Sequence, residues 1–175
     1  AVHIQMHPAG LPDLRPTLEP WLARLGVEYA FAPLALPPDE PLPLSCDRCA
    51  HHRRRTLFFQ ARALACNKVA LAHHADDAAE TTLLNLLQLG RLETLAPARR
   101  YFDGAFTVIR PLILVEERRL AQLARALDAP ADVLACPQAV SSRRAWIRHW
   151  LTDAGRDRRQ MRANLWRVAR RAMGF

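Results

Sequence analysis

The sequence predicts an α/β protein built on a parallel β-sheet. Short apolar runs with the composition of strands alternate with longer segments whose apolar residues recur at helical spacing. Alternation of strand and helix is typical of a parallel sheet whose crossover connections are helices. The run at 68–72 is apolar after its first residue, as expected of a central strand covered on both faces.

The first predicted elements are two strands with a helix between them. The β-branched and apolar composition of 1–6 and 27–32 predicts the strands. Helical spacing of apolar residues predicts a helix over 14–25, and Gly26 favours its C-terminal end. Five prolines within 33–43 exclude a regular element, so we expect an extended surface loop there.

The rest of the chain continues the alternation. Helical patterns occur at 47–65 and, ending at a glycine, at 78–89. A strand is expected at 107–112, followed by an amphipathic helix at 116–127. The last predicted elements are a strand at 131–135 and Arg-rich helices at 141–152 and 156–172.

A length of 175 residues suits one core of ordinary size. We therefore expect an α/β domain over 1–138, with the Arg-rich helices of 139–175 packed on the same domain. No run of about 18 uncharged apolar residues occurs, and the first residues lack the pattern of a signal peptide. We expect a soluble, cytoplasmic protein that does not enter a membrane.

The chain is strongly basic, with a formal net charge of +8, and Lys68 is its only lysine. Guanidinium groups fit phosphate oxygens, and neutralised phosphates release counterions, so the charge favours a nucleic-acid partner. The alternative is an Arg-rich genome composition with solvated helix faces.

Two histidines and two acids follow the predicted strand 68–72. His73, His74, Asp76 and Asp77 lie where ligands of open α/β sheets bind, at the carboxyl end of a strand and the start of a helix. Asp77 with Glu80 three residues later also fits an acidic capping box, so capping and chemistry both remain open.

The segment 69–81 resembles the His-His-x-Asp-Asp signature of tRNA lysidine synthetases and tRNA thiolation enzymes of the adenine nucleotide alpha-hydrolase superfamily. Cys46 and Cys49, followed later by Cys136, are similar to the cysteine pattern of the 2-thiocytidine and 2-thiouridine synthetases, which lysidine synthetases lack. The resemblance implies a Rossmann-like fold, and a PP-loop-type domain over 1–138.

In that group the three cysteines hold a 4Fe–4S cluster with one open iron, which implies Cys46, Cys49 and Cys136 as ligands. Thiolates at this spacing suit such a cluster. Zinc is the alternative metal, with His51 or His52 as a fourth ligand. A metal-free redox pair is a further alternative.

The resemblance also implies the other site residues. Asp77 is the candidate catalytic acid. Arg53, one helical turn after Cys49, is the candidate to clamp phosphate or steady an anionic intermediate, and the alternative is one more solvated arginine. The candidates for binding ATP and Mg²⁺ are His3, Ile4, His73, His74, Asp76 and Arg110.

The family grips pyrophosphate with a Ser-Gly-Gly-x-Asp-Ser loop, and no Gly-Gly pair occurs among the six glycines here. The resemblance begins at the family's second strand. We therefore expect the N-terminal strand and PP-loop to be missing from this sequence, and the fragment to be inactive by itself; a degenerate relative is the alternative. The third-cysteine segment carries one cysteine where some 2-thiocytidine enzymes carry two, which favours the 2-thiouridine style.

The implied reaction is adenylation of a pyrimidine C2 oxygen in tRNA by ATP and Mg²⁺, followed by replacement with sulfur from a persulfide or sulfide carrier. C-terminal arginines interleaved with Trp146, Trp150 and Trp166 are candidates for docking the tRNA. A homodimer is possible. The alternatives are a non-catalytic RNA-binding and metal-binding module, and a ligase of the lysidine type.

Overall fold

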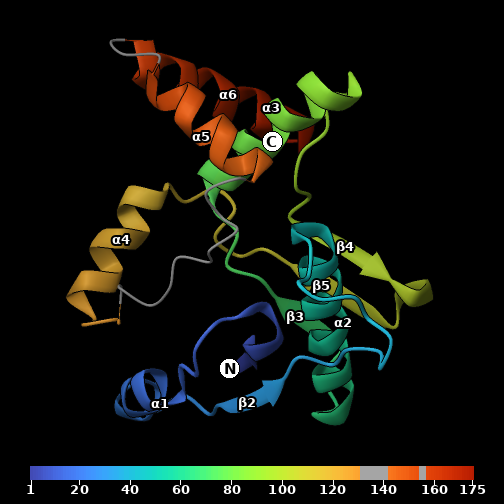
Figure 1. Ribbon diagram of the computed structural model, residues 1–175. Coiled ribbons are helices and arrows are strands. Elements are labelled where there is room, and N and C mark those ends of the chain that lie inside the picture. The colour runs from blue at the N-terminus through green and yellow to red at the C-terminus, as the bar shows by residue number, and fades with distance from the viewer. Residues whose placement is uncertain (131–141, 154–156) are drawn as a thin grey trace. The chain divides into compact units, whose positions relative to one another are not determined.

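The structure, a computed structural model, describes residues 1–130, 142–153 and 157–175 (Figure 1). The predicted strand at 131–135 and Cys136 lie outside the described residues. None of the helices in the described part combines the length and the apolar composition that a membrane span requires.

Every helix predicted within the described residues is present, and each predicted strand there has a counterpart within a few residues. The elements are β1 (Val2–Gln5), α1 (Arg15–Arg24), β2 (Ala30–Pro33), α2 (Cys46–Ala63), β3 (Lys68–Ala70), α3 (Ala75–Leu89), β4 (Ala98–Tyr101), β5 (Phe106–Ile109), α4 (Glu117–Ala126), α5 (Arg143–Asp153) and α6 (Arg158–Ala172). Two single-turn 3₁₀ helices, η1 (His7–Ala9) and η2 (Phe102–Gly104), complete them.

The chain divides into two compact units, and the division falls inside β3. The predicted boundary at 138 between an α/β domain and packed C-terminal helices stays a prediction. The first unit comprises Ala1–Val69 and Ala124–Cys136, and the second comprises Ala70–Leu123 and Pro137–Phe175.

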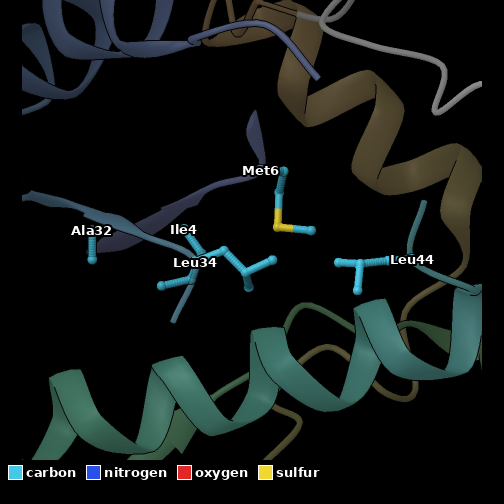
Figure 2. Close-up of a cluster of buried hydrophobic side chains, with 5 residues drawn as sticks. All are labelled: Ile4, Met6, Ala32, Leu34 and Leu44. Carbon is cyan, nitrogen blue, oxygen red and sulfur yellow. The ribbon is translucent and has the colours of Figure 1, made fainter. Parts of the chain in front are cut away.

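The first unit is built on a parallel pair of strands, as the sequence predicted. β1 and β2 pair in register, with Ile4 opposite Ala32. Their buried residues form a core that Leu44 completes from the end of the proline-rich loop (Figure 2). Partly buried Cys49 and Leu57 of α2 pack against this core, so the core fixes the helix that carries the cysteines.

The second unit contains β4 and β5, which belong to a three-stranded sheet in the order β3-β5-β4. β4 pairs antiparallel with β5 through a hairpin and was not predicted. Its sequence, Ala-Arg-Arg-Tyr, has no apolar alternation, and both arginines are exposed. This strand forms because its backbone pairs with β5, which a pattern of side chains does not reveal.

Three helices of the second unit, α3, α5 and α6, pack against one another (Figure 1). Leu83 of α3 packs with Ile147 and Leu151 of α5, and Ala78 of α3 packs with Ala169 of α6. α3 ends at Gly90, whose φ of 63° is the left-handed conformation that favours glycine. α3 is therefore held on two sides, and its first turn is a fixed platform for polar side chains.

Candidate functional site

The first turn of α3 is closed by a reciprocal capping box. His74 has an extended backbone and is the N-cap; its Nδ1 accepts from the Asp77 amide at 3.4 Å, and Asp77 Oδ2 accepts from the His74 amide at 3.0 Å. The sequence suggested a cap from Asp77 to Glu80, and the structure places it three residues earlier. Asp76 and Asp77 both lie in this first turn, where the helix dipole favours negative charge.

Asp76 joins three elements of the second unit. Its Oδ2 accepts a hydrogen bond from the Glu117 amide at 2.8 Å, at the start of α4. Its Oδ1 lies 3.4 Å from Arg162 Nη1 of α6. The carboxylate therefore positions two other helices in addition to any ligand it could hold.

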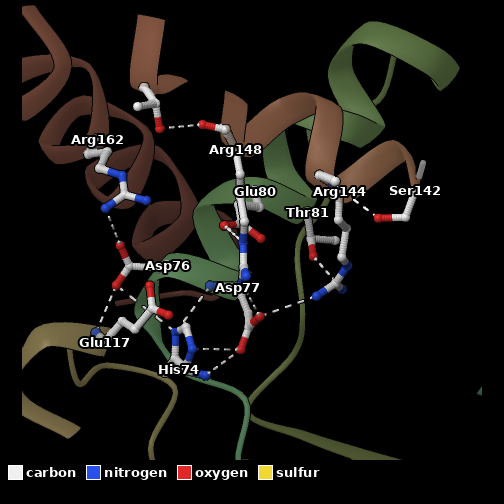
Figure 3. A network of polar contacts seen from close by, with 12 residues as sticks. His74, Asp76, Asp77, Glu80, Thr81, Glu117, Ser142, Arg144, Arg148 and Arg162 are labelled. Carbon is white, nitrogen blue, oxygen red and sulfur yellow. Dashed lines mark hydrogen bonds and ion pairs between the residues drawn. The ribbon is translucent and has the colours of Figure 1, made fainter. Parts of the chain in front are cut away.

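Asp77 faces two arginines of α5 (Figure 3). Arg144 Nη1 lies 3.2 Å from Asp77 Oδ1, and Arg148 Nη2 lies 3.9 Å from the same oxygen. Arg144 also donates to Thr81 Oγ1 at 3.3 Å. Both carboxylate oxygens of Asp77 therefore have partners, one in the cap and one on α5.

Glu80, one turn along α3, is a buried acid with a single strong partner. Its Oε1 accepts from Arg148 Nε at 2.6 Å, and its Oε2 is buried with no hydrogen-bond partner among the described residues. Burial raises the pKa of the Glu80 carboxyl, and the hydrogen bond from Arg148 opposes that rise.

The sequence analysis grouped these arginines with the candidates for docking tRNA and did not predict that they pair with acids of α3. Arg144 and Arg148 are four residues apart on α5, and Asp77 and Glu80 are three apart on α3, so each pair lies on one helix face. Matched spacing of opposite charges on two predicted helices was the available signal. Its meaning depended on which helices pack together.

His73 and Arg110 form a second contact near this site. Arg110 Nε donates to His73 Nδ1 at 3.3 Å, and Arg110 Nη1 donates to the Ala96 carbonyl at 2.5 Å. Arg110 is buried, with 9% of its surface exposed. The structure thus brings the predicted residues His73, His74, Asp76, Asp77 and Arg110 into one unit.

A cavity of about 700 Å³ lies beside the first turn of α3, within the second unit. Asp76 and Glu80 line it together with Arg162 and Trp166 of α6. The Trp166 indole nitrogen is buried and has no hydrogen-bond partner among the described residues. A cavity of this size with convergent polar groups is typical of small-molecule sites.

The cysteine pair lies at the start of α2, in the first unit. Ser45 is the N-cap, and its hydroxyl accepts from the Arg48 amide. Cys46 is exposed and Cys49 partly buried, one helical turn apart on the same face. Two thiolates so placed fit two corners of a metal cluster by donor chemistry. Among the described residues, no three His, Cys, Asp or Glu side chains gather closely enough to hold a metal ion.

A buried acid anchors this turn of α2. Glu40, at the end of the proline-rich loop, accepts from both Nε and Nη2 of Arg48, and its Oε2 lies 2.8 Å from His52 Nε2. The Arg48 hydrogen bonds, then the His52 contact, lower the pKa of Glu40 to about 2, against the opposing effect of burial. His52 is 1% exposed and faces Glu40, which argues against it as the zinc ligand considered from the sequence.

Besides the two cysteines, the first unit carries three predicted site residues, which are His3, Ile4 and Arg53. His3 and Ile4 lie in β1; the Ile4 side chain is part of the core, and burial lowers the pKa of His3. Arg53 is exposed on α2, one turn beyond Cys49. The roles of all the site residues stay predictions.

A family model described as the PP-loop domain matches residues 44–154. The chain belongs to the PP-loop family. Curated relatives include tRNA-cytidine(32) 2-sulfurtransferases. That of Geobacter sulfurreducens is 45% identical over 92 residues, which are 53% of this chain and 36% of the relative. That of Alkalilimnicola ehrlichii is 32% identical over 171 residues, which are 94% of this chain and 54% of the relative.

The PP-loop chain thus spans between about a third and a half of the length of these relatives. Among solved structures, it resembles a U34-tRNA thiolase, NcsA from Methanococcus maripaludis, with its 4Fe–4S cluster. The TM-score is 0.73 at 20% identity, covering 99% of this chain and 62% of that one. This likeness confirms the α/β fold that the sequence predicted.

Proposed function

We propose that this chain forms part of an ATP-dependent tRNA 2-sulfurtransferase that acts in the cytoplasm. The observation that carries the proposal is the combination, in one PP-loop chain, of a Cys-x-x-Cys pair in the first turn of α2 and a His-His-Ala-Asp-Asp segment that opens α3. Relatives with 32% to 45% identity are named for cytidine, so cytidine is the base proposed here in preference to uridine.

The proposed reaction exchanges oxygen for sulfur at C2 of the base. ATP transfers its adenylyl group to the C2 oxygen and releases pyrophosphate. Sulfide, supplied directly by a sulfide carrier or released from a persulfide carrier by a thiol reductant that gives two electrons, then attacks C2, and AMP leaves with the former C2 oxygen. Adenylation is required because the unmodified oxygen is a poor leaving group.

The chain's own residues divide this work. Asp77 is the proposed catalytic acid, and Asp76 and His74, with His73 and Arg110, bind ATP and Mg²⁺. His3 and Ile4 contact the adenine through backbone groups, and Arg53 steadies negative charge near the sulfur. The support for the first set is its clustering around the start of α3 in the second unit.

Cys46, Cys49 and Cys136 would hold a 4Fe–4S cluster. When bound, the cluster would supply an open iron site on which sulfide is held for attack. Supporting this, Cys46 and Cys49 share one face of a helix turn that the core and Glu40 fix in place. Cys136 is included from the sequence pattern alone.

Cluster binding is tested by anaerobic reconstitution of the chain with iron and sulfide, followed by iron analysis and Mössbauer spectroscopy. We expect about four irons per chain, lost in Cys46→Ser and Cys49→Ser and retained in Cys66→Ser, a matched control at an exposed cysteine. Zinc in place of iron, or iron retained without Cys46 and Cys49, would overturn the cluster.

Thiolation is tested by expressing the encoding gene in a bacterium that lacks its own 2-thiocytidine synthetase. Nucleoside mass spectrometry of tRNA should then detect 2-thiocytidine with the parent gene and with Cys66→Ser, but not with Cys46→Ser. Appearance of lysidine or of 2-thiouridine, or of no modified base, would contradict the proposal for cytidine.

A further inference from the structure

The net positive charge of the chain is concentrated in its last 34 residues. Residues 142–175 contain ten arginines and two aspartates, a formal charge of +8 that equals the charge of the whole chain. The preceding residues contain fifteen basic and fifteen acidic side chains. The excess positive charge of the sequence therefore lies in α5, α6 and their flanks, where it favours the approach of a polyanion.

These arginines fall into two groups. Arg144, Arg148 and Arg162 pair with acids of α3, so they hold the helices together. The other arginines with described side chains are exposed and form no ion pair with an acid within 142–153 and 157–175 or elsewhere in the described chain. They are Arg143, Arg159, Arg167, Arg170 and Arg171.

The two faces of α5 differ sharply. Ile147 and Leu151 face the core and are 0% and 1% exposed. Trp146 and Trp150 are 54% and 45% exposed, and their spacing of four residues makes them neighbours on one helix face. Two large aromatic rings on the solvent side of a helix are a feature that the packing of α5 on α3 does not explain.

The third tryptophan of this region is different. The Trp166 indole nitrogen is buried, and the Arg170 guanidinium lies 5.2 Å from its ring centroid. Its ring is thus already engaged within the protein. Of the three tryptophans that the sequence offered for docking, the structure selects Trp146 and Trp150.

We propose that the outer face of α5, defined by Trp146 and Trp150 and flanked by the exposed arginines of α5 and α6, is an RNA-docking surface for unpaired nucleotides of tRNA. Indole rings stack on any exposed base, and arginines neutralise the neighbouring phosphates. The combination of two exposed indole rings with five exposed arginines that pair with no acid in the described part of the chain favours RNA over a protein partner, whose surface offers neither stacked bases nor a row of phosphates. This inference rests on the proposed function for the identity of the RNA.

The test measures binding of an unmodified tRNA transcript to the whole chain by fluorescence anisotropy over a range of salt concentrations. Trp146→Ala/Trp150→Ala should weaken binding by at least about 5-fold, and by about 100-fold if both rings stack on bases. Phe102→Ala, at a 64% exposed aromatic of the same unit, is the matched control and should bind as the parent does.

The contribution of the exposed arginines is measured separately, through the salt dependence of tRNA binding. Arg167→Gln/Arg171→Gln should weaken binding and reduce the salt dependence by about one to two counterions. Arg99→Gln/Arg100→Gln, two exposed arginines on β4, should leave the salt dependence unchanged. Circular dichroism and light scattering on each variant establish that it is folded and report its oligomeric state.

The outcomes separate the surface from the function. If Trp146→Ala/Trp150→Ala binds tRNA as tightly as the parent, the docking surface is overturned and the sulfurtransferase proposal stands. A parent that binds no tRNA overturns both. If the parent dimerises and Trp146→Ala/Trp150→Ala is monomeric, this face is a contact between copies of the chain, which also overturns RNA docking.

Discussion

The carboxylate of Glu80 and the guanidinium of Arg148 are joined by a 2.6 Å hydrogen bond, although Glu80 is 1% exposed and Arg148 is 48% exposed at the side chain. A carboxyl group is therefore buried at the contact between α3 and α5, and one half-exposed arginine is its hydrogen-bond partner. Removing that arginine would leave the acid uncompensated, and this is more damaging than removing both partners.

We expect Arg148→Ala to lower the free energy of unfolding by about 1–3 kcal/mol, less than for a fully buried pair because Arg148 is partly solvated. Glu80→Gln/Arg148→Ala should recover at least half of that loss. Urea denaturation of the single and double variants measures both effects. A double variant no more stable than Arg148→Ala would show that the packing of the arginine stem, and not its charge, matters.

The pairing of Glu80 with Arg148 also predicts how the stability of Arg148→Ala depends on pH. The folded pKa of Glu80 is raised by burial, so its protonated form is favoured by folding, and stability falls as pH rises from the ordinary value through the raised pKa. Without Arg148 this fall becomes larger. The stability difference between parent and Arg148→Ala should therefore shrink as pH is lowered from 8 toward 4.5, and denaturation at several pH values tests it.

Glu40 behaves in the opposite sense. Its folded pKa is lowered from 4.5 to about 2, chiefly by Arg48, so its ionised form is favoured by folding. The stability it contributes is complete above pH 4.5 and is lost as pH falls toward 2. Glu40→Gln should be less stable than the parent at pH 6, and the difference should vanish near pH 2. An unchanged difference across this range would exclude Glu40 as the titrating group.

Much of the fold was predictable from local pattern, because its helices have apolar residues at helical spacing and glycines follow α1 and α3. The sequence predicted that polar residues open α3, but it did not predict which of them caps the helix. His74 became the cap because its own extended backbone directs Nδ1 to the Asp77 amide, and no spacing rule separates this from a cap at Asp77. β4 was missed because its exposed arginines resemble a loop, and the roles of Arg144 and Arg148 depended on a helix contact distant in sequence.

Asp77 can be tested for capping and for chemistry separately. Asp77→Asn keeps an oxygen for the His74 amide, so it should stay within about 1 kcal/mol of the parent, whereas Asp77→Ala loses the reciprocal half of the capping box and about 1 kcal/mol more. In the nucleoside assay, Asp77→Asn should reduce 2-thiocytidine at least about 100-fold, as expected for a lost acid. If Asp77→Asn retains 2-thiocytidine at the parent level, Asp77 only caps the helix.

The two faces of α5 predict opposite effects of truncation. Ile147 is fully buried against Leu83, so Ile147→Ala should leave a cavity and cost about 2–5 kcal/mol of unfolding free energy. Trp146 is a larger side chain immediately before it, but more than half of it is exposed, so Trp146→Ala should cost less than about 1 kcal/mol. Urea denaturation measures both. If Trp146→Ala cost as much as Ile147→Ala, that tryptophan would be a packing residue, and weakened RNA binding by its variant would reflect unfolding; a small cost leaves its exposed ring available for contact with another molecule.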